Sequence, residues 1–74
     1  MREGLLWYDD DPRRRLEDKV RDAAARYQQR FGIAPNVCYV NAQVLETAEV
    51  RVAGISLRRM AAVQPNYFWI GHAA

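Results

Sequence analysis

The chain lacks the residues that most often cross-link a small domain. Its 74 residues include one cysteine, Cys38, and one histidine, His72. A single thiol excludes an intramolecular disulfide, and this pair of residues is too small a set for a structural zinc site. A domain of this size buries a small share of its surface, so its stability is thin. Oligomerisation is the remaining common means of stabilising it.

Long hydrophobic runs are also missing. No apolar stretch approaches the roughly 20 residues of a membrane span, and the first residues lack the long apolar core of a signal peptide. Cys38 lies in the apolar run 37–40, a setting typical of a buried thiol in a reducing compartment. We therefore expect a cytoplasmic protein with a single domain over residues 1–74.

The excess of positive charge is small. Eleven Lys and Arg residues against nine Asp and Glu residues give a net charge of +2. A DNA-binding protein commonly neutralises about 6 to 10 phosphates, so this excess favours nucleic-acid binding only if the charges are segregated in space. Most basic residues of 13–30 have an acidic residue four positions away, as Arg14 has Asp18. We expect them to form a self-paired, solvated helix face.

The residue patterns of common active sites are absent as well. No nucleophile, base and orienting acid occur in a recognisable pattern, and no glycine-rich loop offers a phosphate site. The acidic run Asp9, Asp10 and Asp11 lacks the spaced ligands of a calcium loop. We predict a non-enzymatic protein with no cofactor or metal; an active site at a dimer seam near Asp9, Asp10 and His72 is a weaker hypothesis.

Apolar periodicity predicts one long helix over residues 12–31. Asp11 is a favourable N-cap, and Pro12 suits the first helical position. Gly32 can adopt the left-handed conformation that ends a helix, and Pro35 prevents its continuation. Residues three or four positions apart form a single apolar stripe: Leu16, Val20, Ala23, Ala24, Tyr27 and Phe31.

The remaining apolar segments predict a strand or an extended arm at residues 4–8 and strands at 36–40 and 67–70, with a short helix at 42–47 capped by Asn41. In the last strand Tyr67 and Trp69 point to one face and Phe68 and Ile70 to the other, which is typical of a fully buried strand. Residues 50–58 form a hairpin if Ala53 and Gly54 make a two-residue turn, or one bulged strand otherwise. We predict a two-layer α+β fold, with the long helix packed on a small, mainly antiparallel sheet.

The aromatic residues are more numerous than one helix-covered core needs. One helix covers only one face of a small sheet, so the excess indicates a surface that requires a partner. We predict a protein-interaction module that self-associates, in its simplest form as a symmetric dimer. The predicted interface consists of Trp7, Tyr67, Phe68 and Trp69.

An alternative hypothesis is a nucleic-acid-binding accessory protein. Arg51, Arg58 and Arg59 could share a sheet face with exposed aromatic residues, and both groups can contact nucleic-acid bases. The same arginines could instead cover the aromatic face with their aliphatic stems, or pair with Glu46 and Glu49.

Three segments carry a resemblance that spans most of the chain. They are residues 6–12 (LWYDDDP), 31–40 (FGIAPNVCYV) and 65–71 (PNYFWIG). Together they resemble a family of short uncharacterised bacterial proteins. The resemblance implies an independent, small cytoplasmic protein and carries over no activity, cofactor or catalytic residue.

Overall fold

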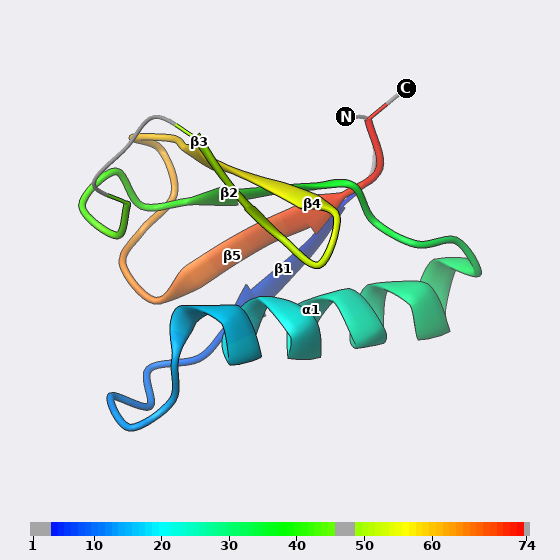
Figure 1. The fold of residues 1–74 in the computed structure, drawn as a ribbon, viewed down its shortest axis with the longest axis horizontal. Coiled ribbons are helices and arrows are strands. Elements are labelled where there is room, and N and C mark those ends of the chain that lie inside the picture. Colours follow the sequence, from blue (N-terminus) through cyan, green and yellow to red (C-terminus); the bar gives the residue numbers. More distant parts are fainter. Residues whose placement is uncertain (1–3, 46–48, 74) are drawn as a thin grey trace.

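In the computed structural model, residues 4–45 and 49–73 are described. They form one helix that packs along one side of a five-stranded sheet (Figure 1). This arrangement confirms the α+β prediction. The elements in chain order are β1 (Gly4–Tyr8), α1 (Leu16–Phe31), β2 (Val37–Val40), β3 (Glu49–Val52), β4 (Ile55–Arg59) and β5 (Tyr67–Gly71).

The sheet has the strand order β1-β5-β2-β4-β3. Strand β5 runs antiparallel to both β1 and β2, so β1 and β2 are parallel to each other, and α1 connects them as a split β-α-β unit. Strand β4 runs parallel to β2 and antiparallel to β3. The sheet is therefore mixed rather than mainly antiparallel, because the β3–β4 hairpin returns the chain alongside β2 in the direction of β2.

The helix is shorter than the predicted 12–31. Asp11 does not cap it; instead, its Oδ1 accepts a hydrogen bond from the Arg13 N–H at 2.9 Å, and its carbonyl accepts one from the Arg14 N–H at 3.3 Å. These bonds close a turn before the helix, in which the aspartate side chain bonds to the main chain two residues on. Arg15, in an extended conformation, is the N-cap. The C-terminal end agrees with the prediction: Gly32 has a φ of 77°, and its N–H donates to the Gln28 carbonyl at 2.9 Å.

The core lies between α1 and one face of the sheet. The predicted helix stripe contributes buried Val20, Ala23 and Tyr27, with Leu16, Ala24 and Phe31 packed around them. Tyr27 and Phe31 rings contact each other at 4.5 Å between centroids. The sheet contributes Cys38, Val40, Val52, Ile55, Leu57, Phe68 and Ile70.

Two local alternatives are decided by the main chain. Ala53 and Gly54 have φ angles of 51° and 79°, and Val52 pairs with Ile55, so they form a two-residue hairpin turn of type I′ rather than a bulge. The predicted short helix at 42–47 does not form over its described part. Residues 42–44 make a turn in which Asn41 accepts hydrogen bonds from the Gln43 and Val44 N–H groups, and 46–48 lie outside the described residues.

Candidate functional site

The face of the sheet opposite α1 is the candidate functional surface, here called the open face. Strand pairing aligns the side chains on it, because Leu6 lies opposite Trp69, Tyr8 opposite Tyr67, and Trp69 also opposite Tyr39. These residues alternate with Leu5, Trp7, Phe68 and Ile70, which face the helix and the core. No helix covers the open face among the described residues (Figure 1).

An apolar groove crosses the open face beside β1 and β5. It has a volume of about 470 Å³. Leu6 is 55% exposed and Tyr8, next to the groove, is 51% exposed, which are high values for large apolar side chains in strands. The groove is lined by Leu6, Met60, Ala62, Val63, Gln64, Tyr67 and Trp69. Its lining is mostly apolar, so it suits an apolar partner surface rather than a charged ligand.

The segment between β4 and β5 forms one wall of the groove. Its first half is held against β2 and the residue that follows β2: the Met60 N–H donates to the Val40 carbonyl at 2.9 Å, and the Asn41 Nδ2 donates to the Val63 carbonyl at 3.0 Å. Asn66 adopts a φ of 70° as the chain enters β5. This left-handed conformation suits asparagine and turns the chain into the strand.

The aromatic residues of the open face are packed on their neighbours. Tyr8 and Tyr67 rings lie 4.8 Å apart with an interplanar angle of 56°. The Trp69 indole lies against Gly4, where an added Cβ would be only 2.9 Å from a ring carbon. Glycine at this position therefore leaves room for the indole beside β1. The pKa of the Tyr8 hydroxyl is raised, mainly by partial burial and to a smaller extent by a hydrogen bond with Asp10.

The far part of the open face carries two arginines, and Glu49 is the register partner of Arg58 there. Arg51 on β3 and Ser56 on β4 are paired in register, and the Arg51 Nη1 donates to the Ser56 Oγ at 3.5 Å. They line a polar depression of about 250 Å³ together with Asn36, Val37, Arg58 and Ala73. Arg59 pairs with Val40 and so points to the opposite side of the sheet. The structure therefore brings Arg51 and Arg58 together and separates Arg59 from them.

The predicted interface residues are divided between the two faces. Tyr67 and Trp69 lie on the open face, as their alternation indicated. Phe68 is a core residue at 3% exposure, and Trp7 packs against the core on the helix side, with its Nε1 buried and without a hydrogen-bond partner. These two cannot form a docking surface, because α1 covers their side of the sheet. The predicted interface did not include Leu6, Tyr8 or Met60, which lie in or beside the groove. The alternation of Leu6 and Tyr8 with Trp7 along β1 could have placed these two on the face opposite Trp7.

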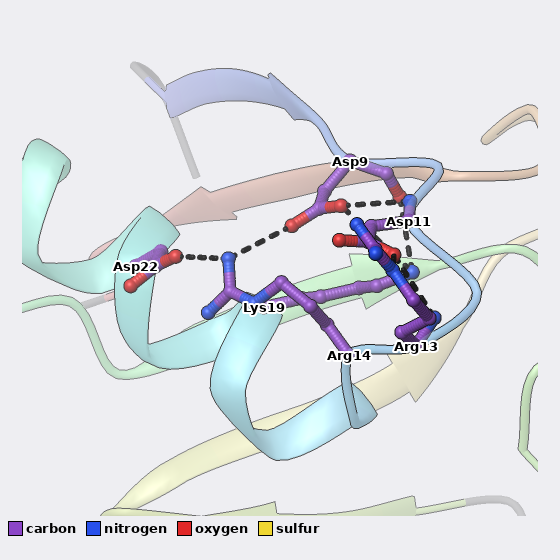
Figure 2. Close-up of polar contacts among 6 residues, drawn as sticks. All are labelled: Asp9, Asp11, Arg13, Arg14, Lys19 and Asp22. Atoms are coloured by element: carbon purple, nitrogen blue, oxygen red, sulfur yellow. Dashed lines mark hydrogen bonds and ion pairs between the residues drawn. The ribbon is translucent and has the colours of Figure 1, made fainter.

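The acidic run of residues 9–11 contacts basic side chains (Figure 2). Asp9 contacts Arg14 at 3.2 Å and Lys19 at 4.0 Å, and Asp11 contacts Arg13 at 3.3 Å. These pairs differ from the predicted helical ones, because Arg13 and Arg14 precede α1 and do not follow helical spacing. In the part of the chain that the structure describes, no three His, Cys, Asp or Glu side chains are grouped to hold a metal ion.

The two remaining reactive side chains lie away from the open-face groove. Cys38 is fully buried on the helix side of the sheet, and this burial raises the pKa of its thiol to about 12. The His72 Nδ1 lies 3.3 Å from the Ala34 carbonyl, on the segment that precedes β2. An active site at a dimer seam was expected to combine Asp9 and Asp10 with His72. These residues lie at opposite ends of the β1–β5 pair: His72 follows Gly71, which is aligned with the start of β1, and Asp9 and Asp10 follow the end of β1.

No helix within residues 4–45 and 49–73 is long and apolar enough to cross a membrane. The chain matches no family model, no curated protein and no solved structure.

Proposed function

We propose that this protein is a small cytoplasmic, non-enzymatic interaction module that self-associates as a dimer through the apolar part of its open face. The observation that carries the proposal is the exposure of Leu6 and Tyr8 beside a groove lined by Met60, Tyr67 and Trp69. Contiguous apolar surface of this kind marks interaction sites in small proteins. The unpaired, buried thiol of Cys38 is compatible with a reducing cytoplasm.

The expected affinity follows from the exposed area. Tyr8 is about half exposed, so its burial removes roughly 100 Å² from water, which contributes about 2.5 kcal/mol. Burying the exposed half of Leu6 contributes about 1 to 1.5 kcal/mol. Two subunits give roughly 8 kcal/mol from these residues, and the groove adds more, against an association cost of about 4 to 15 kcal/mol. A dimer that dissociates at micromolar concentrations requires a net gain of about 8 kcal/mol, so even at the lowest association cost the two grooves must contribute about 4 kcal/mol beyond Leu6 and Tyr8.

The test is the mass in solution by light scattering over a dilution series, at low and high salt. We expect a dimer that persists at high salt, because the contact is apolar. Trp69→Ala should weaken the dimer while leaving the helical circular-dichroism signal intact. Ile33→Ala is the control, because Ile33 is an exposed apolar residue outside the sheet. A wild-type monomer at every concentration would contradict the proposal.

A second candidate function is binding of single-stranded nucleic acid across the arginine-bearing part of the open face. It is favoured by the placement of Arg51 and Arg58 on the same face as Tyr39 and Trp69, since stacking on aromatic rings beside positive charge is the usual mode for single strands. Neutralising two phosphates gives a salt slope of about −1.4, or roughly a sevenfold loss of affinity between 50 and 200 mM salt.

Fluorescence anisotropy with labelled oligonucleotides tests this candidate. Arg51→Ala combined with Arg58→Ala should reduce binding, whereas Arg59→Ala should not, because Arg59 lies on the opposite side of the sheet. An absence of binding at 50 mM salt would remove this second function.

A further inference from the structure

Strand β1 is one edge of the sheet, and no other described strand pairs with its outer side. The Asp9 N–H donates to the Asn66 carbonyl at 3.0 Å, which defines a hydrogen-bonded pair next to the end of β1. Hydrogen-bonded and non-bonded pairs alternate in an antiparallel ladder. The main-chain groups of Leu5 and Trp7 therefore point to β5, whereas those of Gly4, Leu6 and Tyr8 point outward.

This edge lacks the features that usually prevent strands from pairing with other chains. Natural edge strands are commonly interrupted by charged residues, proline or bulges. Strand β1 (GLLWY) has no charged residue and no proline, and it pairs with β5 in an unbroken register. The opposite edge strand, β3 (EVRV), carries two charged residues in four. Of the two edges, β1 is the one suited to accept another strand.

We propose that β1 pairs antiparallel with β1 of a second copy of this chain, about a two-fold axis at Leu6, so that the two sheets become one. This inference rests on the self-association proposed above and specifies its geometry. With Leu6 opposite Leu6 of the second copy, Gly4 lies opposite Tyr8. Every outward N–H and C=O group of β1 then has a partner within the other β1. Registers centred on Leu5 or Trp7 leave one outward residue of each strand without a partner in β1.

The side chains of the two copies are compatible with this register. On the open face, exposed Leu6 and Tyr8 of both copies become cross-strand neighbours beside the two grooves, so they cover the sides of one another's side chains at the seam. On the helix side, Leu5 lies opposite Trp7 of the second copy, and both are apolar. An antiparallel pair about a two-fold axis is self-complementary, so one uncharged strand supplies both halves of the interface.

The position of the arginines also favours edge pairing over stacking of the two open faces. Strand β4, which carries Arg58, is the third neighbour of β1. At about 4.8 Å between strands, the β4 strands of the two copies are separated by roughly 34 Å in the joined sheet. This is several times the Debye length of about 8 Å at physiological salt. Fully overlapping open faces would instead lie about 10 Å apart, and the arrangement that places β1 over β1 of the second copy would also bring the arginine-bearing strands face to face.

Disulfide formation by Leu6→Cys tests the register directly. Two residues 6 at the axis have Cα atoms about 5.5 Å apart, which is within the range of disulfides. Tyr8→Cys is the matched control, because Tyr8 is on the same strand and face with a similar exposure of 51%. In the proposed register its two copies are offset by about 13 Å along the strand and cannot be bridged. Cys38 does not compete, since it is fully buried.

The two variants are oxidised under native conditions and their covalent mass is measured. We expect Leu6→Cys to form a covalent dimer at least tenfold faster than Tyr8→Cys, and 6 M urea should remove the difference. Equal rates, or faster linkage of Tyr8→Cys, would overturn the edge pairing. If light scattering shows a dimer while Leu6→Cys does not link preferentially, self-association stands and this geometry fails. A monomer at all concentrations removes both.

Amide hydrogen exchange of the unmodified protein tests the same geometry without a variant. The Leu6 and Tyr8 amides should exchange at least tenfold more slowly at 1 mM than at 10 μM protein, because they become hydrogen-bonded at the seam. The Leu5 and Trp7 amides are internal controls, since they bond to β5 in either state and should change less. Leu6 and Tyr8 exchange that is independent of concentration, in a protein shown to be dimeric, would overturn the proposal.

Discussion

Asp9 connects the end of the β1 edge to the start of α1, and its replacement by alanine tests how this strand is held in place. Its Oδ1 accepts a hydrogen bond from the Asp11 N–H at 3.0 Å, and its Oδ2 accepts one from the Arg14 Nη1 at 3.2 Å (Figure 2). The Lys19 ammonium donates to the Asp9 carbonyl at 3.3 Å and lies 4.0 Å from the carboxylate. The Asp9 side chain is only 13% exposed.

The expected loss of stability follows from these contacts. A hydrogen bond to a charged group contributes about 1.5 to 3 kcal/mol to stability. The bond from Arg14 contributes about 1.5 kcal/mol or less, because this side chain is partly exposed and water screens its charge. Removing the carboxylate also leaves the mostly buried Lys19 without its counter-charge. We expect Asp9→Ala to lower the free energy of unfolding by about 2 to 4 kcal/mol. Asp22→Ala should cost less than about 1 kcal/mol. Asp22 contacts the same Arg14 nitrogen at 2.5 Å but is 47% exposed.

Urea unfolding followed by tryptophan fluorescence measures both changes. The protein is kept at about 1 μM, so that dimer formation does not add to the apparent stability. For a chain of this size the slope is about 1 kcal/mol per M urea, so the Asp9→Ala midpoint should fall by roughly 2 to 4 M. A fall below about 0.5 M, or one equal to that of Asp22→Ala, would refute the inference that Asp9 anchors β1 to the helix.

Three further outcomes are expected. Leu57→Ala should lower the free energy of unfolding by about 3 kcal/mol, because Leu57 is fully buried in β4; a urea midpoint near that of the wild type would contradict its place in the core. Cys38 should react with a thiol reagent only on unfolding. Because its folded pKa is raised from 9.0 to about 12, the folded state holds the proton more tightly. Its contribution to stability is therefore complete below pH 9 and is lost as the pH rises toward 12; urea midpoints of Cys38→Ala should lack this alkaline component. Asp11 has a pKa lowered by hydrogen bonds from the Arg13 main chain and side chain. Its contribution is present above its ordinary value of 3.8 and is lost as the pH falls through the lower folded value, so thermal midpoints of Asp11→Asn between pH 2 and 6 should depend less on pH than those of the wild type.

Several features could be predicted because they depend on residues close together in sequence. The apolar stripe of α1 and its termination at Gly32 follow from helical spacing and from the freedom of glycine at positive φ. The division of Tyr67 and Trp69 from Phe68 and Ile70 follows from strand alternation. The start of α1 could not be predicted in the same way. Asp11 is equally suited to capping a helix and to a turn in which it accepts a hydrogen bond from the Arg13 N–H. In the structure the turn forms, together with a contact between Asp9 and Arg14 that local sequence patterns do not reveal.

The sequence by itself thus determined the body and C-terminal end of α1, the strands β1, β2 and β5, the face to which each side chain points along its own strand, and the burial of Cys38. Only the tertiary structure decided which strands are neighbours and which face α1 covers. Trp7 and Phe68 became core residues, Arg59 was separated from Arg58, and β1 became an edge. The physical reason is that alternation orients side chains within one strand, whereas strand order depends on pairings between segments far apart in the chain.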